Sequence, residues 1–253
     1  MSSVVDRIRN IAKDGMLLDR MFWKASVTWK PFSVTSFKIV SALTKHEAEF
    51  TTIIDGGANI GQFARAVVEL YPTARVFCFE PLEDIATELK LNLRDCQRVT
   101  VVQAALASTN KSLPFFRNLY HQASSALEIK PEASQLHEKV SESTTKIHVN
   151  AVSLDEYFSN NEIVGPTLLK LDLQGYELQA LHGATRILPQ VDFVLVEVAV
   201  QQSYEGEPEK GMIESFMLDQ GFEQIDILNS LVDGDGNITQ VDVLFKKCGH
   251  HDA

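Results

Sequence analysis

The chain of 253 residues has few cysteines and no long apolar run. Cys78, Cys96 and Cys248 are odd in number and far apart, which argues against a disulfide framework and against a C-x-x-C metal site. No stretch approaches the ~18 consecutive apolar residues of a membrane-spanning helix. Charged residues interrupt residues 1–15, which lack the apolar core of a secretion signal. We therefore expect a cytoplasmic protein with no membrane span.

Long basic runs are also missing, since the longest is the pair Lys246 and Lys247. The net charge is −11 and the isoelectric point about 5.1, so the surface as a whole repels phosphate groups. We expect no nucleic-acid partner. Hydrophobic residues make up 45% of the chain, which is ordinary for a globular protein and sufficient for one large domain.

Residues 51–81 carry the clearest signal in the chain. A β-branched run at 51–54 ends at Asp55 and opens into a glycine-rich turn. An apolar-periodic helix follows, and a second strand at 75–79 ends on Glu80. In such a strand–turn–helix–strand unit, an acid about 20 residues past the turn holds the ribose of a bound nucleoside. We expect the ligand to contact the turn and the second strand end at Gly56, Gly57, Ala58, Asn59, Gly61, Glu80 and Pro81.

Asp55 bears on which nucleoside ligand is bound. In dinucleotide sites the turn and the helix N-terminus hold a pyrophosphate, which a carboxylate at this position would repel. The ammonium and sulfonium groups of S-adenosylmethionine would instead be attracted. The turn also departs from G-x-G-x-x-G, because Ala58 stands at the middle glycine. We favour S-adenosylmethionine over a nicotinamide cofactor, while a turn that merely connects two elements stays open.

The rest of the chain alternates strand and helix and ends in a hairpin. Ala104 and Ala105, at the small-residue end of a third strand, are candidates to border the adenine ring, although close packing explains them equally well. This order predicts an α/β fold with a mostly parallel sheet that ends in an antiparallel hairpin. Beyond the first unit, strands are expected at 99–106, 167–172, 192–198, 222–228 and 240–246, and helices at 83–94, 176–188 and around 213–218.

Acids stand at four predicted strand ends: Asp55, Glu80, Asp172 and Glu197. Ligands of open α/β sheets bind outside the carboxyl ends of the strands, so these side chains should meet there. Clustered carboxylates are costly, and a cationic ligand relieves that cost. One of them with a raised pKa could accept a proton from a substrate hydroxyl. Asp172 and Glu197 are the candidate bases, with His121 third.

Three segments fall outside this pattern. Residues 1–48 form an N-terminal helical extension that either packs on the sheet edge or closes the substrate pocket. In its first part, Val4, Ile8, Ile11 and Ala12 share one helix face. Residues 108–150 are too long for an ordinary connection and combine strands at 113–117 and 146–154 with a polar stretch at 121–143. That insertion is either a solvated loop or a source of substrate contacts. Residues 249–253 are a tail, and we do not assign a metal site to its two histidines, His250 and His251.

Several separated motifs together resemble the FkbM family of class I methyltransferases: DGGANIGQFA, FCFEP, AALAS, SSAL, SLDE, LLKLDLQGYELQALHGA and LVEV. The resemblance implies S-adenosylmethionine as cofactor and O-methylation of a sugar, polyketide or related metabolite. It also implies a Rossmann-like sheet of seven strands with an antiparallel last strand and helices on both faces, over residues 49–248. Residues 55–61 and Glu80 would then hold the cofactor. A second signature, Lys170, Asp172, Gly175 and Glu177, would border the transfer site.

The departures from related enzymes narrow the expectation. Asp172 is followed by Leu-Gln-Gly, so the Pro-Pro-aromatic motif of amino-group nucleic-acid methyltransferases is absent. Glu197 is followed by Val-Ala instead of the Asp-Asn pair of many metal-dependent O-methyltransferases, and we assign no metal. The expected partner is a small-molecule acceptor or a glycan- or lipid-linked one. A nicotinamide-dependent oxidoreductase and a non-catalytic nucleoside-binding module are the alternatives.

Overall fold

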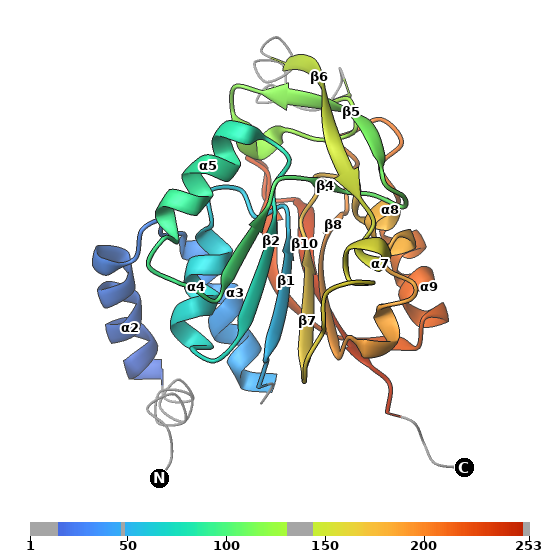
Figure 1. The fold of residues 1–253 in the computed structure, drawn as a ribbon. Helices are drawn as coiled ribbons and strands as arrows, with labels where there is room; N and C mark the ends of the chain where they lie inside the picture. Colours follow the sequence, from blue (N-terminus) through green and yellow to red (C-terminus); the bar gives the residue numbers. More distant parts are fainter. Residues whose placement is uncertain (1–14, 47–48, 131–143, 250–253) are drawn as a thin grey trace.

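A seven-stranded sheet forms the centre of the molecule, and helices cover both of its faces (Figure 1). The computed structural model describes residues 15–46, 49–130 and 144–249. The strand order is β3-β2-β1-β7-β8-β10-β9, and only β10 runs antiparallel to its neighbours, which confirms the predicted sheet. Its strands are β1 (Thr52–Gly56), β2 (Arg75–Phe79), β3 (Val99–Val102), β7 (Thr167–Leu171), β8 (Phe193–Ala199), β9 (Phe222–Val232) and β10 (Ile238–Lys247).

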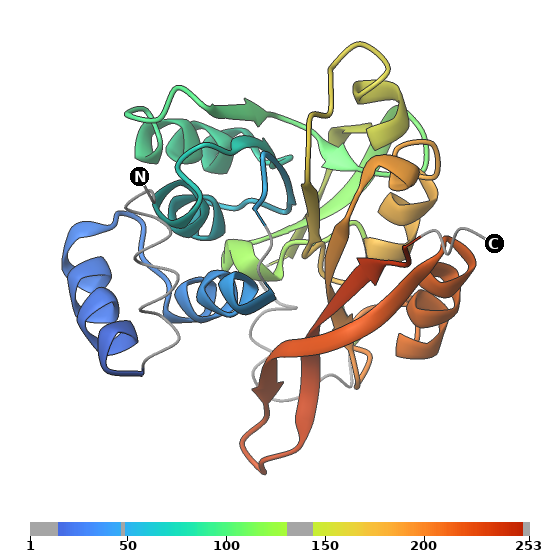
Figure 2. The ribbon, with the colours of Figure 1, turned by 90° about the horizontal axis from the view of Figure 1, so that it is seen from below.

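The central strands are apolar on both sides because a layer of helices packs on each face. Every residue of β1 and β7 is buried, as parallel strands between two helical layers require. Helices α3 (Val34–Leu43), α4 (Gln62–Leu70) and α5 (Glu83–Asn92) share a core with one face, which includes Ile53 and Leu195. Helices α8 (Glu177–His182) and α9 (Lys210–Asp219) pack on the other, against Ile54 and Val194 (Figure 2). Within the described ranges, no helix combines the length and the apolar character needed to cross a membrane.

Two predicted elements are shorter in the structure than the sequence suggested. The strand expected at 99–106 divides, because the chain bends where the Ala104 N–H donates to the Val102 carbonyl, and β4 (Ala105–Leu106) joins a second sheet. The helix expected at 176–188 ends at His182. Gly183 packs so closely on Ala107 that a Cβ there would lie 2.1 Å from the Ala107 carbonyl oxygen, and the chain continues in turns to η3 (Leu188–Gln190).

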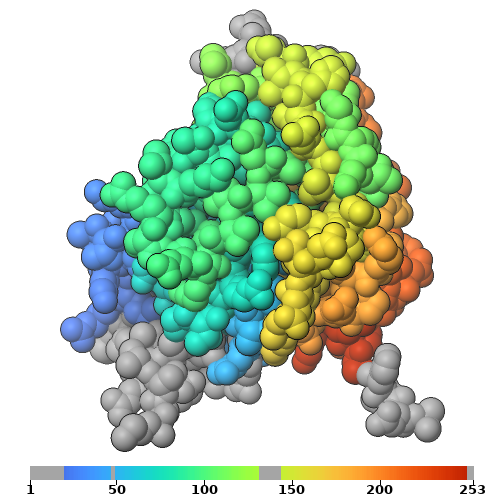
Figure 3. Space-filling model, viewed as in Figure 1, coloured from blue at the N-terminus to red at the C-terminus, as the bar shows by residue number. Residues whose placement is uncertain are grey.

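The insertion at 108–150 contains a small sheet where a solvated loop was one of the expectations. Strands β5 (Lys111–Asn118) and β6 (Thr144–Val152) pair antiparallel, and β4 pairs with β6 in parallel. Leu113, Phe115 and Val149 form a core with Leu82 and Ile85 of the large domain. The green and yellow segments therefore cover the top of the molecule (Figure 1; Figure 3). Most of the polar stretch, residues 131–143, lies outside the described residues.

The N-terminal segment contributes α2 (Gly15–Thr28), α3 and η1 (Thr44–His46), with α3 packed against α4 and β9. Ser33 begins α3 as its N-cap, since its Oγ accepts a hydrogen bond from the Ser36 N–H at 3.2 Å. Val4, Ile8, Ile11 and Ala12, and the tail histidines His250 and His251, lie outside the described residues.

Gly57 occupies a position where any side chain would be strained. Its φ is +74°, and a Cβ there would lie 1.9 Å from the backbone oxygen of Asp172. Gly57→Ala should lower the free energy of unfolding by at least about 1–3 kcal/mol, the cost of a strained φ alone. Gly234→Ala is the control, because a Cβ at that position would have no atom within 4 Å and its φ is not positive. Equal urea midpoints for the two variants would contradict the close approach of the turn to β7.

Candidate active site

A pocket of about 940 Å³ lies at the carboxyl ends of β1, β2, β7 and β8, between the large sheet, η2 (His121–Ala123) and the start of α3. Ligand sites range over roughly 300–1,000 Å³, so this one is large enough for a cofactor and an acceptor together. It brings together most of the predicted site residues: Gly57, Ala58, Asn59, Glu80, Pro81, Ala104, Ala105, His121, Asp172 and Glu197. Asp55, Gly56 and Gly61 do not line it.

The glycine-rich turn forms the floor at one end of the pocket. The N–H groups of Gly57 and Ala58 both donate to the Phe79 carbonyl, which holds the turn against the end of β2. Gly56 and Gly61 act by close packing: a Cβ would lie 2.7 Å from Leu106 at the first position and 2.6 Å from Leu89 at the second. These two glycines let the chain turn, and they do not face the ligand space.

Glu80 ties the turn to the second strand. Its Oε2 accepts from the Asn59 N–H at 3.1 Å and its Oε1 from the Leu82 N–H at 2.9 Å. Burial raises the pKa of the carboxyl group to about 7, while these two backbone hydrogen bonds act in the opposite direction. The side chain is therefore held in one orientation at the pocket wall.

Asp55 lies at the carboxyl end of β1, as the sequence predicted, but behind the pocket wall. Its side chain is fully buried, and its Oδ1 lies 3.1 Å from Nζ of Lys170. The cause is strand register, because Asp55 and Lys170 are direct partners across β1 and β7. Burial raises the pKa of Asp55, and the Lys170 ammonium acts against that rise. Asp55 therefore does not line the pocket, and a direct contact between its carboxylate and the charged groups of the cofactor stays a prediction.

Lys170 connects the turn to the neighbouring acid. Its ammonium lies 3.5 Å from Oδ2 of Asp172 and donates to the carbonyls of Gly56 and Gly57 at 3.4 Å each. It also lies over the ring of Phe63, 5.4 Å from the centroid. Burial lowers the pKa of Lys170, but Asp55 and Asp172 outweigh that effect and leave it raised. The residue is therefore a buried cation held at the edge of the pocket.

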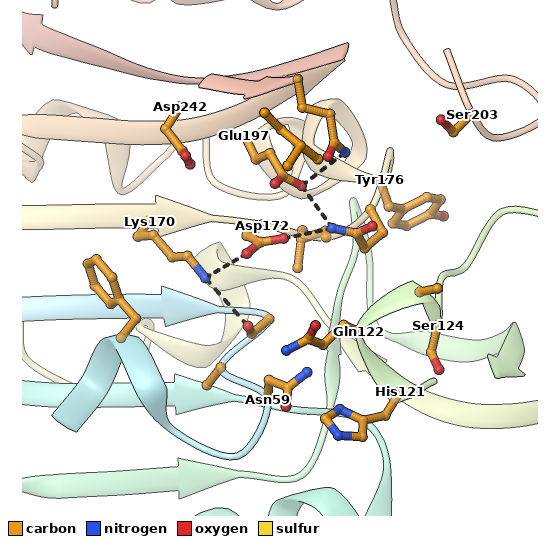
Figure 4. A pocket seen from close by; sticks show the side chains of 18 of the residues that line it. Asn59, His121, Gln122, Ser124, Lys170, Asp172, Tyr176, Glu197, Ser203 and Asp242 are labelled. Atoms are coloured by element: carbon orange, nitrogen blue, oxygen red, sulfur yellow. Dashed lines mark hydrogen bonds and ion pairs between the residues drawn. The ribbon is translucent and has the colours of Figure 1, made fainter. Parts of the chain in front are cut away.

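Gln174 organises the acids on the other side. Its Nε2 donates to Oδ1 of Asp172 at 3.0 Å and to Oε2 of Glu197 at 2.8 Å, and its Oε1 accepts from the Tyr204 hydroxyl at 3.0 Å. Dashed lines at the labelled Asp172 and Glu197 mark the first two of these bonds (Figure 4). An ionised carboxylate such as that of Asp172 only accepts, so the amide must turn its nitrogen toward it. Sequence reasoning missed Gln174 and Tyr204. Gln174 stands between Asp172 and Gly175 of the second family signature, and that position was a signal in the sequence. In the structure its φ is positive, at 55°. Nothing in the sequence marked Tyr204.

Glu197 and Asp242 extend the acidic row across β8 and β10, where they are register partners. Burial raises the pKa of Glu197 well above its usual range, and the carboxylates of Asp172 and Asp242 add to that rise. Burial also raises the pKa of Asp242 to about 6, against a 2.9 Å hydrogen bond from Nδ2 of Asn229. Asp242 and Asn229 line the pocket but were missed, because only the register of the hairpin brings them to it.

Glu177, from the second family signature, supports the loop that carries Gln174. Its Oε1 accepts from the N–H groups of Leu173 and Gly175. It is buried outside the pocket lining, and burial raises its pKa to about 8. Its position is structural: it holds the chain where that chain turns away from β7.

His121 lies across the pocket from the acids, on the same side as Gln122 and Asn59 (Figure 4). Its ring stacks on Tyr120 at an interplanar angle of 24°, and its buried Nδ1 has no hydrogen-bond partner among the described residues. Ser33 and Ser36 of the N-terminal segment also line the pocket, so that segment takes part in enclosing it. Across the described ranges, no group of three His, Cys, Asp or Glu side chains is arranged to hold a metal ion.

Comparison with known proteins agrees with this geometry. The 2-O-methyltransferase NoeI of Sinorhizobium fredii is 27% identical over 175 residues, which cover 67% of this chain and 71% of NoeI. The hexuronic acid methyltransferase AglP of Haloferax volcanii is 30% identical over 172 residues, 67% of this chain and 65% of AglP. Methyltransferase sdnD of Sordaria araneosa is 28% identical over 196 residues, 68% of this chain and 73% of sdnD.

The family model of the methyltransferase FkbM domain matches residues 55–223, from the last part of β1 to the start of β9. That span contains the glycine-rich turn, Glu80, Lys170, Gln174 and both candidate bases. The chain therefore belongs to the FkbM family of methyltransferases and is an enzyme that uses S-adenosylmethionine.

Proposed function

We propose that this methyltransferase transfers its methyl group to a hydroxyl of a sugar or a related polyhydroxylated metabolite. The observation that carries the proposal is the division of one pocket into two halves. A turn, a strand-end glutamate and small alanines form one half, and carboxylates and amides form the other. The similarity to NoeI, a 2-O-methyltransferase, and to AglP, a hexuronic acid methyltransferase, supports a sugar acceptor.

The first half fits the cofactor. The oriented carboxylate of Glu80 is placed to accept hydrogen bonds from the two ribose hydroxyls. Gly57 lines the pocket without a side chain, and Ala104 and Ala105 leave room for a flat ring. When bound, S-adenosylmethionine supplies an electrophilic methyl group on a sulfonium, which is a good leaving group. The acids along the lining favour that positive charge.

In the second half Asp172 is the proposed general base. Its side chain is 37% exposed, and both Lys170 and Gln174 hold its carboxylate from behind. It would take the proton of the acceptor hydroxyl as the oxygen bonds to the methyl carbon and the carbon–sulfur bond breaks. Alignment of oxygen, carbon and sulfur supplies much of the acceleration. His121, across the pocket, is the remaining candidate for contact with the acceptor.

Glu197 has a different proposed role. Because its pKa is raised well above the usual range, this carboxyl group retains its proton in neutral solution more readily than an ordinary glutamate. One proton at Glu197 lowers the repulsion between neighbouring acids, and Asp172 can then act in its ionised form. Transfer of a labelled methyl group to a panel of sugar glycosides tests the proposed function directly. If the labelled cofactor binds but its methyl group is never transferred to any hydroxyl, that result would argue against the proposed function.

Glu80→Gln should weaken binding of the demethylated cofactor, S-adenosylhomocysteine, by roughly 1–3 kcal/mol, because an amide cannot accept with both atoms. Calorimetry gives the dissociation constant. Glu83→Gln is the matched control, since this exposed glutamate lies three positions along the chain and does not line the pocket. If both variants bind like the wild type, the ribose is held elsewhere.

The substitutions Asp172→Asn and Glu197→Gln distinguish the roles of the two acids, because each replaces a carboxyl group by an amide of nearly the same shape. Asp172→Asn should lower the saturated rate by ~100- to 10,000-fold, the usual contribution of a positioned base. Glu197→Gln mimics the protonated carboxyl group and should retain most of the rate. Rate at saturation and cofactor affinity are measured on each variant. A large loss of affinity in Asp172→Asn, with the saturated rate intact, would make Asp172 a cofactor ligand instead.

The buried acids also predict how stability depends on pH. Burial raises the pKa of Asp242 to about 6, of Glu80 to about 7 and of Glu177 to about 8, above the ordinary values of 3.8, 4.5 and 4.5. Their contribution to stability is therefore complete below those ordinary values and is lost as the pH rises through the folded values. The ligand-free protein should have a lower free energy of unfolding at about pH 8.5 than at about pH 5.5. Urea denaturation at both pH values measures the difference.

Asp242→Asn should reduce that pH dependence, because it removes the acid whose pKa burial raises to about 6. Asp219→Asn, at an exposed position of α9, is the control and should leave the dependence unchanged. A free energy of unfolding that increases over the same range would show that these acids are not buried in solution.

A further inference from the structure

The β9–β10 hairpin projects past the rest of the large sheet. β8 pairs with β10 only from Gln240 onward, so among the described residues the turn end of the hairpin has no neighbouring strand (Figure 2). This end carries three large apolar side chains that are about half exposed: Leu231 at 54%, Val232 at 54% and Ile238 at 46%. Val232 and Ile238 are register partners. We refer to these three residues as the hairpin lip.

The hairpin lip is continuous with the active-site pocket. Leu231 and Val232 line the same pocket as Asp172, together with Gln240 and Asp242 from deeper positions in the hairpin. Tyr120, between β5 and η2, also lines the pocket and is 59% exposed. The lining thus changes from carboxylates and amides inside to an outer end where the large apolar side chains of Leu231 and Val232 lie beside Asp233 and Thr239.

This change in polarity bears on the shape of the acceptor. Single exposed apolar residues are common on soluble proteins, but a group at the end of a ligand pocket marks a binding surface. A sugar alone uses the polar interior and leaves the lip in water. A molecule with an apolar part attached to its sugar covers both, at about 25 cal/mol for each Å² of apolar surface removed from water.

The charges near the hairpin lip favour a single molecule over a membrane surface. The turn that connects the two strands carries Asp233 and Asp235, and the chain as a whole has a net charge of −11. Anionic lipid headgroups would be repelled there. An uncharged alkyl or ring system reaching out of the pocket meets no such repulsion.

We propose that the acceptor is amphipathic, with its hydroxyl-bearing sugar in the polar interior and a directly attached apolar chain or ring system along the hairpin lip. This inference rests on the proposed sugar methylation and goes further by requiring the apolar part. It assigns Leu231 and Val232 to acceptor affinity, and it assigns them no part in cofactor binding.

Matched pairs of glycosides test the proposal. Methyl and octyl glycosides of the same sugars are titrated calorimetrically into the full chain saturated with S-adenosylhomocysteine, below micelle-forming concentrations. For at least one sugar the octyl member should bind at least about tenfold more tightly, as partial burial of its chain implies. The double variant L231S/V232S should lose that preference and keep its affinity for S-adenosylhomocysteine. L218S is the control, because Leu218 is 68% exposed on α9 and does not line the pocket.

Three results would overturn the inference. The octyl member could fail to bind more tightly in every pair, or the preference could persist unchanged in L231S/V232S. Sedimentation could also show a dimer that this double variant dissociates without any change in chain-length preference, which would make the lip a contact between copies.

Transfer of labelled methyl groups separates this inference from the proposed function. Equal transfer to methyl and octyl members would leave the function standing and remove the amphipathic acceptor. A preference for the octyl member that depends on the hairpin lip, without any methyl transfer, would leave the amphipathic ligand standing and remove the proposed function.

Discussion

A single buried cation, Lys170, makes the active-site edge of the sheet possible. Asp55 lies on β1, and Asp172 directly follows the adjacent strand β7. Without the cation, the fully buried Asp55 would be an unpaired carboxylate in a region of low dielectric. The ammonium lies within 3.5 Å of both and also contacts the carbonyls of the glycine-rich turn. Turn geometry, strand register and the position of the candidate base therefore depend on one ion-pair network. Replacing only Lys170 would leave a buried carboxylate without a partner.

The remaining acids are accommodated by neutral donors. Gln174 supplies one N–H to Asp172 and another to Glu197, and Asn229 does the same for Asp242. Amides satisfy acceptor oxygens but add no charge, so the row keeps a negative potential toward the pocket. A negative potential of this kind favours a positively charged ligand. The sulfonium of S-adenosylmethionine carries such a charge.

Most of the fold could be predicted because its signals are local. The strand ends at Gly56, Phe79 and Leu171 follow from apolar runs that stop at acids or glycines, and the FkbM match confirms the family that the motifs indicated. The pocket was predictable to the same degree, since parallel strand ends meet at one edge. The role of Asp55 was not, because pairing with Lys170 depends on register between strands more than a hundred residues apart. Gln174 apart, the missed residues are also non-local: Tyr204, Asn229 and Asp242 reach the pocket only through tertiary packing.

The two halves of the pocket are constrained to different degrees. Its cofactor half is built from buried strand ends and from glycines where a Cβ would overlap backbone or side-chain atoms, so substitutions there disturb the core. Its acceptor half is built from η2, the start of α3 and the projecting hairpin, where Leu231 and Val232 are half exposed. Changes at such positions alter what the pocket accepts at little cost in stability, because surface substitutions seldom exceed about 0.5 kcal/mol. The proposed assignment of the two halves therefore makes acceptor choice separable from methyl transfer.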